Sequence, residues 1–472
     1  MTLQREPGTA RRAPRPASPP RAPQQSALSR GIRKLQEFLD SRPLIDYSVI
    51  RGCVLTLAGL GVVMVMSSSM ATSFAASASV WAQAARQTFM VCLGLFAFWA
   101  ALRTPPERLK TASSWLMGLS VLLLILVLTP LGTGREEVGS QSWLVVGPFR
   151  LQPSELARIA IAMWGAKVLA NKNLRKRSNQ ESGLYTFGFV AGLTLVLIAL
   201  QGDFGMALSF ALVVGFILFF AGIALVSVLA LGVGGLISLA LVFFAGGFRS
   251  ARFHVYFDAL SGNFEDTKGA AFQSHQGFLS LADGSLFGVG LGQSRAKWFY
   301  LPEARNDFIF AVIGEELGLW GGVLVIGLFT LIACFGFRAA RRAQTQYQSL
   351  MAAAITAAVV SQAFVNIGYV VGLLPVTGIQ LPMLSAGGSS AVITLGAMGV
   401  LCSIARHEPD AISSMQNYGR PRFDRVFFID EPRSLRQLRP ERRAPVQEQR
   451  PRRVPRTAGR YDGPRPHATN WK

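Results

Sequence analysis

One acidic residue lies where a polar segment gives way to a long apolar run. Asp307 follows the polar residues Glu303, Arg305 and Asn306, and it directly precedes Phe308 and the apolar residues after it. A carboxylate at the start of a helix is favoured by the macrodipole, and it can act as a general base when a hydroxyl lies within hydrogen-bond reach. The spacing leaves two interpretations open. Asp307 is a base, or Asp307 or Asn306 only caps the helix.

Two basic residues precede this carboxylate in the sequence. Lys297 and Arg305 could bind a diphosphate, or they could neutralise Glu303 and Asp307. Two turns further along the expected helix stand Glu315 and Glu316. At 100° per residue neither shares a face with Asp307, so a carboxylate dyad is not expected. We expect one of the two glutamates to face the bundle interior and pair with a cation.

A second polar group is the run Gln152-Pro153-Ser154-Glu155, followed by Arg158. Pro153 before Ser154 and Glu155 indicates a helix start. Glu155 and Arg158 are three residues apart and could pair on one face, either as a plain intrahelical ion pair or in an interhelical or functional role.

A third group, residues 374–390, holds two prolines and three glycines between apolar runs. Irregular backbone at membrane depth is tolerated only inside protein or along a wet cavity, so this segment is not expected to face lipid.

Long apolar runs dictate the elements that must position these groups. Of the 472 residues, 50% are hydrophobic and only 15% are charged. Charge-free runs of roughly 18 or more residues indicate membrane-spanning helices. The sequence predicts an all-α, polytopic membrane protein with about ten spans, at 48–68, 86–103, 113–131, 155–171, 185–200, 204–221, 223–247, 307–337, 349–373 and 386–405.

The basic residues indicate the orientation. Arg and Lys gather in every second loop, so the positive-inside rule places both termini in the cytoplasm. It also predicts a large extracytoplasmic loop at about 248–306. We expect residues 47–406 to form the transmembrane domain, and 1–46 and 407–472 to be disordered, basic cytoplasmic tails. Much of the net charge of +21 lies in these tails, which favours binding of anionic lipid or a docking partner over nucleic acid.

No metal centre or disulfide framework is indicated. Cys53, Cys92, Cys334 and Cys402 all fall inside apolar runs, and the four histidines have no ligand spacing.

The polar motifs together resemble those of the SEDS family, the FtsW/RodA/SpoVE type of membrane glycosyltransferases. The matching residues are Gln152–Glu155, Gly288–Gly292, Lys297, Leu301–Ala304, Asp307–Ala311, Glu315–Gly318, Leu374–Gly378, Pro382 and Gly387–Ser390. The resemblance covers about 48–406, and it is stronger to the divisional branch than to the elongation branch. This chain departs from the family in having Ser142 before Trp143, Arg158 for a lysine, Gly202 for a proline and Ala386 for a tyrosine.

The resemblance implies a peptidoglycan polymerase of the inner membrane at the division septum. Its substrate would be lipid II, and Asp307 would deprotonate the acceptor hydroxyl. No cofactor is certain, although a divalent cation, Mg²⁺ or Mn²⁺, could assist. The implied partners are a class B penicillin-binding protein and other division proteins, the latter through the tails. The candidate substrate-binding residues are Lys297, Arg305, Glu303, Arg252, Gln152, Glu155, Arg158, Gln273, Ser389 and Ser390.

Three alternatives stay open: a lipid II flippase, a scaffold that acts through its tails, and a polymerase of cell elongation. A flippase would require charges accessible from both sides of the membrane. A scaffold would tolerate Asp307→Ala and fail when its tails are deleted.

Overall fold

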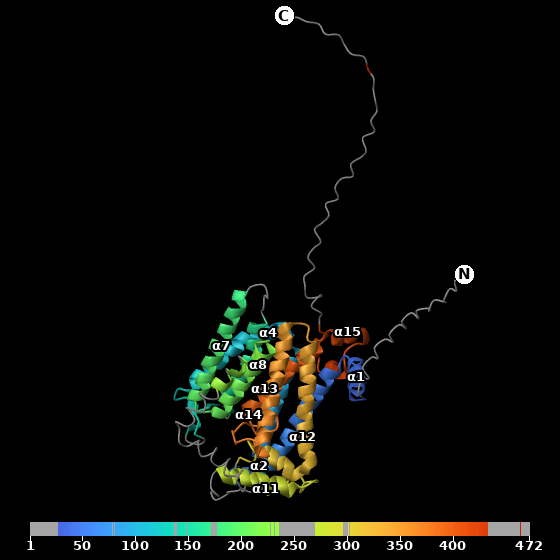
Figure 1. Ribbon diagram of the computed structural model, residues 1–472. Helices are drawn as coiled ribbons and strands as arrows, with labels where there is room; N and C mark the ends of the chain where they lie inside the picture. The colour runs from blue at the N-terminus through green and yellow to red at the C-terminus, as the bar shows by residue number, and fades with distance from the viewer. Residues whose placement is uncertain are drawn as a thin grey trace, which may run out of the picture. The chain divides into compact units, whose positions relative to one another are not determined.

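A computed structural model describes residues 27–77, 79, 81–135, 139–147, 149–170, 177–226, 228–230, 232–235, 270–295, 301, 303–432 and 463. The predicted all-α membrane fold is confirmed, because the helices run side by side as a bundle (Figure 1). The helices of the bundle are α2 (Ile45–Ser77), α3 (Ala82–Arg103), α4 (Pro106–Val127), α6 (Pro153–Leu169), α7 (Arg177–Leu200), α8 (Phe204–Phe220), α12 (Ile309–Arg342), α13 (Gln346–Val370) and α14 (Gly388–Arg406).

Length and composition identify membrane spans among these helices. Within the described residues, seven helices are long and apolar enough to cross a bilayer, and α8 is a shorter apolar helix. The protein is therefore a multi-pass membrane protein. The span expected at 223–247 is described only in part, at 223–226, 228–230 and 232–235, so the count of ten remains a prediction.

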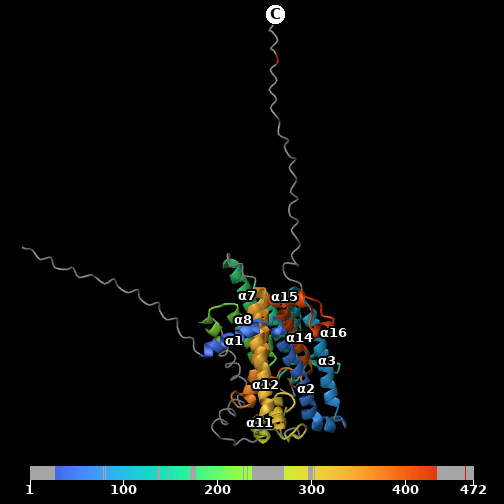
Figure 2. The ribbon, with the colours of Figure 1, turned by 90° about the vertical axis from the view of Figure 1, so that its right-hand side faces the viewer.

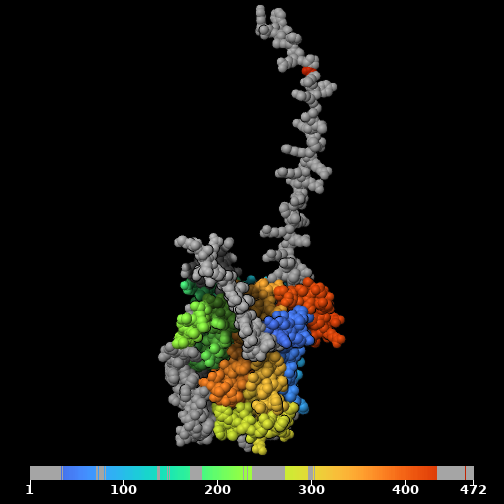
Figure 3. Space-filling model, turned by 45° about the vertical axis from the view of Figure 1, so that its right-hand side comes forward, coloured from blue at the N-terminus to red at the C-terminus, as the bar shows by residue number. Residues whose placement is uncertain are grey.

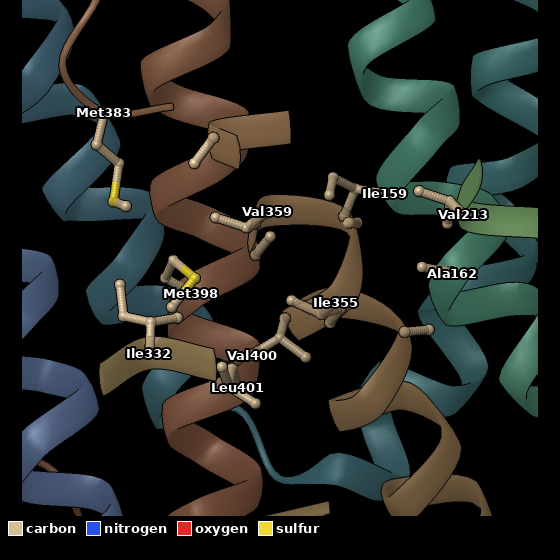
Figure 4. Close-up of a cluster of buried hydrophobic side chains, with 14 of the residues drawn as sticks. Ile159, Ala162, Val213, Ile332, Ile355, Val359, Met383, Met398, Val400 and Leu401 are labelled. Atoms are coloured by element: carbon tan, nitrogen blue, oxygen red, sulfur yellow. The ribbon is translucent and has the colours of Figure 1, made fainter. Parts of the chain in front are cut away.

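The core lies around α13 and α14. In each of these helices 78% of the most apolar stretch is buried, against 28–44% in the other spans. Small residues allow this close packing. A side chain at Gly399 of α14 would collide with the carbonyl oxygen of Phe98 on α3, and one at Gly336 of α12 with Thr356 on α13. Figure 4 shows the aliphatic cluster that fills this centre, including Val359 on α13.

The break in α12 divides that helix into two parts. Gly318 has φ 68° and ψ −163°, a conformation available essentially to glycine alone. Backbone carbonyls at the break are satisfied from another loop. The amide of Val289 donates to the carbonyl of Glu315 at 2.9 Å, and that of Gly290 to the carbonyl of Glu316 at 3.1 Å. α12 is thus a nine-residue helix joined at an angle to a longer one.

The two ends of α12 define two ends of the bundle. The Asp307 end holds the turn before α12 and the helix α11 (Ala270–Gly284), which lies across it (Figure 1). A three-stranded antiparallel sheet lies between α4 and α6, with β1 (Gly132–Thr133), β2 (Trp143–Val146) and β3 (Phe149–Leu151) in the order β1-β2-β3. The sheet leads directly into the N-terminus of α6.

The Arg406 end is held by ion pairs. Arg338 pairs with Asp40 at 2.8 Å and with Asp46, while Arg342 pairs with Asp40 at 2.6 Å and with Glu408 at 3.1 Å. These contacts join α12 to α1 (Ala27–Asp40), to α2 and to the segment that follows α14. Figure 3 shows α1 in blue beside that segment in red.

The inner ends of both predicted tails differ from the expectation. α1 is helical because residues 24–42 contain no proline, whereas 7–23 contain six. Residues 409–432, here called the C-terminal strap, contain α15 (Pro409–Tyr418) and α16 (Arg422–Val426). The strap packs on the bundle because its buried Asp424 binds Arg406 and Tyr47. Averaging charge and proline over a whole tail concealed both segments.

Candidate functional site

The turn that carries Asp307 is fixed through its backbone. Asn366 Nδ2 and the Tyr369 hydroxyl, both on α13, donate to the Asp307 carbonyl oxygen at 2.9 and 3.0 Å. The hydroxyl of Ser385 donates to the carbonyl of Asn306 at 2.7 Å. The amide of Ala386 donates to the carbonyl of Arg305 at 2.9 Å. Three consecutive carbonyls therefore have partners, and these bonds fix the backbone of the turn.

The start of α12 bears on the capping interpretation. The helix begins at Ile309, and Phe308 occupies its N-cap position, where no side chain caps the backbone. Asp307 precedes that position and is half-buried. Both interpretations of Asp307, general base and helix cap, therefore remain predictions.

The same two α13 side chains also hold the irregular segment between α13 and α14. Asn366 Nδ2 and the Tyr369 hydroxyl each donate to the carbonyl of Ile379 at 2.7 Å. Gln362 Nε2 donates to the carbonyl of Gln380 at 2.9 Å. The second half of this segment is largely buried, from Ile379 to Ser385, whereas Leu374 and Gly378 are exposed. The prediction that the segment does not face lipid therefore holds only for its second half. Asn366, Tyr369 and Ser385 did not emerge as site residues from the sequence, since amides and hydroxyls inside apolar helices carry no motif.

α11 covers the turn from the other side. A side chain at Gly277 would lie 2.9 Å from the ring of Phe308, and one at Gly284 would collide with the backbone at Gly314. Gln273 is one turn before Gly277, so it lies on the same face of α11. This arrangement brings the predicted Gln273 to the side of the helix that faces the Asp307 turn.

Both glutamates of α12 are buried, and each accepts hydrogen bonds from another part of the chain. Glu315 accepts hydrogen bonds from the Ser294 hydroxyl at 2.7 Å and from the Arg295 amide at 2.6 Å. Glu316 accepts from the Ser67 hydroxyl on α2 at 2.6 Å. The Glu315 carboxylate therefore anchors the loop after α11. The pairing of one of the two glutamates with a cation remains a prediction.

The second polar group gathers at the N-terminus of α6. Gln152 Nε2 donates to Asp203 at 2.9 Å, and the Gln152 amide donates to the Ser389 hydroxyl at 3.3 Å. Asp203 in turn caps α8 by accepting from the Met206 amide at 3.1 Å. Glu155 interacts with the Ser390 hydroxyl. The predicted residues Gln152 and Glu155 therefore contact the predicted Ser389 and Ser390. Asp203 joins this group, and its only signal in the sequence was its position as a cap before an apolar run.

Arg158 lies deeper between three helices. Its side chain is fully buried and donates to Ser209 on α8 at 3.3 Å and to the carbonyl of Ala358 on α13 at 3.4 Å. Two of its guanidinium nitrogens and one Glu155 oxygen have no hydrogen-bond partner. Buried polar atoms of this kind are those that ordered water satisfies in other proteins. No ion pair joins Arg158 to Glu155 within the described part of the chain.

The remaining predicted residues separate into two sets. Arg305 is half-buried, and Glu303, which accepts from Asn306, is exposed. Lys297 and Arg252 lie outside the described residues. Among the residues that the structure describes, no three Asp, Glu, His or Cys side chains gather as a metal site.

One segment connects the two polar groups. Ser385 binds the Asp307 turn, and Ser389, four residues later at the start of α14, binds Gln152. The segment between α13 and α14 thus contacts both the turn before α12 and the polar group at the start of α6, in a bundle of membrane-spanning helices.

Comparison with known proteins places this arrangement in a family. The family described as cell cycle protein, of the FtsW, RodA and SpoVE type, matches residues 47–410, and the chain belongs to it. The protein is 36% identical over 425 residues to the "Probable peptidoglycan glycosyltransferase FtsW" of Mycobacterium tuberculosis, covering 88% of this chain and 80% of the relative. It is also 36% identical to the "Stage V sporulation protein E" of Bacillus subtilis, covering 75% and 95%.

Solved structures share the fold. The rod shape determining protein RodA of Thermus thermophilus is similar with a TM-score of 0.55 and 26% identity, covering 76% of this chain and 96% of that one. A chain from a structure titled "Structural coordination of polymerization and crosslinking by a peptidoglycan synthase complex" gives a TM-score of 0.59 at 25% identity, covering 76% and 97%. The predicted family membership is confirmed.

Proposed function

We propose that this protein is a peptidoglycan glycosyltransferase that polymerises lipid II, with Asp307 as its general base. The observation that carries the proposal is that the backbone of the Asp307 turn is fixed. Two side chains of α13 and the hydroxyl of Ser385 donate hydrogen bonds to its carbonyls and thereby position the turn. Family membership and the names of the relatives support the reaction class.

In this mechanism the Asp307 carboxylate accepts the proton of the acceptor GlcNAc 4-hydroxyl. The hydroxyl oxygen attacks C1 of the donor MurNAc, and the bond from C1 to undecaprenyl diphosphate breaks. A carboxylate needs only hydrogen-bond reach of that hydroxyl. A backbone held at three consecutive carbonyls limits the displacement of the base, and displacements of about 1 Å can cost about 100-fold in rate.

The developing charge on the diphosphate calls for cations. Arg305, two residues before the base, is the candidate in the described part of the chain, with Lys297 and Arg252 proposed alongside it. Arg158 lies between α6, α8 and α13, so we assign it to helix packing and buried water instead. We further propose that both termini are cytoplasmic, that the enzyme acts at the division septum, and that a class B penicillin-binding protein is its partner.

Polymerisation of labelled lipid II by the purified protein, with its transpeptidase partner, tests the proposal. Wild type, Asp307→Asn and Asp307→Ala are compared with Asp283→Asn, which removes an exposed carboxylate on α11. We expect glycan strands from wild type and Asp283→Asn, and none from well-folded Asp307 variants. Equal polymer from every variant would reject Asp307 as the base.

A lipid II flippase is the second candidate, because Glu155 and Arg158 are ionisable side chains buried between the membrane helices. No polymer from any variant with the partner confirmed bound, together with lipid II translocation in liposomes, would favour it. Localisation of the tagged protein distinguishes a role in elongation from a role in division. A protein that gathers at the lateral wall instead of the septum would favour elongation.

A further inference from the structure

The C-terminal strap presents an apolar surface that the family match does not include. The match ends at residue 410, and the strap continues to 432. Large apolar side chains near its end are open, with Val426 67%, Phe427 46% and Phe428 76% exposed. Exposed apolar residues that lie together on a fixed element indicate an interaction surface.

The strap is firmly attached, so this exposure is not that of a frayed end. Asp424 of α16 is fully buried, pairs with Arg406 Nε at 2.7 Å and accepts from the Tyr47 hydroxyl. The side chain of Ile429 is also fully buried. Between these two anchors the chain turns outward, and Phe428 adopts φ 53°, which is uncommon for a bulky residue.

The patch continues the outward side of a membrane span. Trp99 of α3 donates its indole N–H to the carbonyl of Phe427 at 2.9 Å. The Trp99 ring lies 5.6 Å from that of Phe96, which is exposed on α3 together with Phe89 and Leu93. Figure 2 shows α16 beside α3. The exposed face of α3 is a lipid-facing face by its composition, and the strap meets it one turn before the helix ends at Arg103.

Several charged side chains surround the patch, and two of the basic ones are exposed without an ion pair in the described residues. The carboxylate of Asp430 lies 3.8 Å from Arg103 and 4.0 Å from Arg420, and that of Glu431 lies 3.9 Å from Arg420. Arg422 and Arg425 of α16 are exposed, and within the described residues neither takes part in an ion pair. The surface is therefore aromatic at its edge with basic side chains beside it.

We propose that the C-terminal strap is a membrane-surface anchor, in which Phe427 and Phe428 enter the bilayer interface and Arg422 and Arg425 bind anionic lipid headgroups. Aromatic rings suit the boundary between headgroups and acyl chains, and basic side chains next to it are drawn to anionic lipid. Continuity with the lipid-facing side of α3 favours lipid over a protein partner, since the rings extend a surface that is already in the membrane.

Fluorescence quenching in lipid nanodiscs tests this anchor on the purified full-length protein. In a background with the exposed Cys92 and Cys334 replaced by alanine, a bimane label is placed at Phe428→Cys or, as the matched control, at Ser413→Cys on the exposed side of α15. We expect the label at 428 to be quenched several-fold more by nitroxide lipid than the label at 413, and less by aqueous iodide.

The headgroup contact is tested by Arg422→Gln with Arg425→Gln. This pair should reduce lipid quenching of the label at 428 in nanodiscs with anionic lipid and leave it unchanged in zwitterionic ones. Equal iodide quenching at 428 and 413 would overturn the anchor and point to a surface for a protein partner. Protection at 428 from both quenchers would overturn it too, because the patch would then be covered by protein. An identical response of the arginine variant in both lipids would reject the headgroup contact.

Discussion

The two ends of α12 are fixed by opposite chemistry. At the Asp307 end, neutral amides and hydroxyls hold backbone carbonyls, as Asn366, Tyr369 and Ser385 do. At the Arg406 end, charged side chains neutralise one another, as Arg338 and Arg342 of α12 do with Asp40. Neutral donors can position a backbone without adding charge that would disturb a neighbouring carboxylate. Ion pairs instead neutralise the charges of the side chains that form them.

The largest effect should follow from breaking the Arg406 end. Asp424→Ala leaves the buried Arg406 guanidinium without its carboxylate, and removing one partner of a buried pair costs about 3–5 kcal/mol. We expect a matching loss in the free energy of unfolding, measured by chemical denaturation in nanodiscs. A loss below about 1 kcal/mol would mean that water reaches Arg406 and that the pair is not sealed.

At the Asp307 end the loss should appear in rate more than in stability. Tyr369→Phe removes the hydroxyl that binds the carbonyls of Asp307 and Ile379 but keeps the ring beside Phe308. If the base shifts by a fraction of an ångström to about 1 Å, lipid II polymerisation should slow by about 10- to 100-fold. Tyr185→Phe, on the exposed side of α7, is the control. An unchanged rate with an unchanged pH profile would make Tyr369 a packing residue only.

The pH dependence of stability should report on Glu408. Burial, followed by the nearby Asp46, raises the pKa of Glu408 from 4.5 to about 9, and Arg342 opposes the shift. The folded protein therefore holds a proton that the unfolded chain releases above pH 4.5. Stability should be full below that pH and fall as the pH rises toward 9, by up to about 1.4 kcal/mol per pH unit.

Glu408→Gln isolates this contribution, because the amide is neutral at every pH and can still accept from Arg342. Denaturation of wild type and variant from pH 5 to pH 9 should show a flatter profile for the variant. Parallel profiles would place the titrating group elsewhere.

The smallest expected effect concerns Asp430, the exposed aspartate of the C-terminal strap, in contrast to the buried Asp424. The side chain of Asp430 is 80% exposed, and its nearest cation, on Arg103, is 3.8 Å away. Asp430→Asn should change the free energy of unfolding by less than about 1 kcal/mol, since exposed pairs contribute little. A change as large as that of Asp424→Ala would show that exposure does not separate the two aspartates.

Apolar periodicity was sufficient to predict most of the bundle. Nine predicted spans correspond to α2, α3, α4, α6, α7, α8, α12, α13 and α14. The ends were less accurate where polar residues extend a helix, as at α7, which begins at Arg177 instead of 185. α1 and the C-terminal strap escaped prediction because their stability comes from ion pairs with residues distant in the sequence.

The sequence predicted the charged residues of the candidate site, but not the neutral side chains that hold the Asp307 turn. Asp307 and Gln152 stand at helix starts, which the sequence marks by a change in polarity. The bonds to Asn366 and Tyr369 join residues 59 and 62 positions away from Asp307, so no local pattern reveals them. The roles of Asp307 and of the substrate-binding residues remain predictions that the polymerisation assay decides.

The glycine break in α12 has a consequence for membrane depth. The 24 residues after Gly318 reach about 36 Å at 1.5 Å per residue, enough for a hydrocarbon core of about 30 Å. The nine residues before it need not cross at all. Their position is set by α11, α13 and the carbonyl caps at Glu315 and Glu316. The depth of Asp307 therefore depends on these contacts and not on the length of the crossing helix.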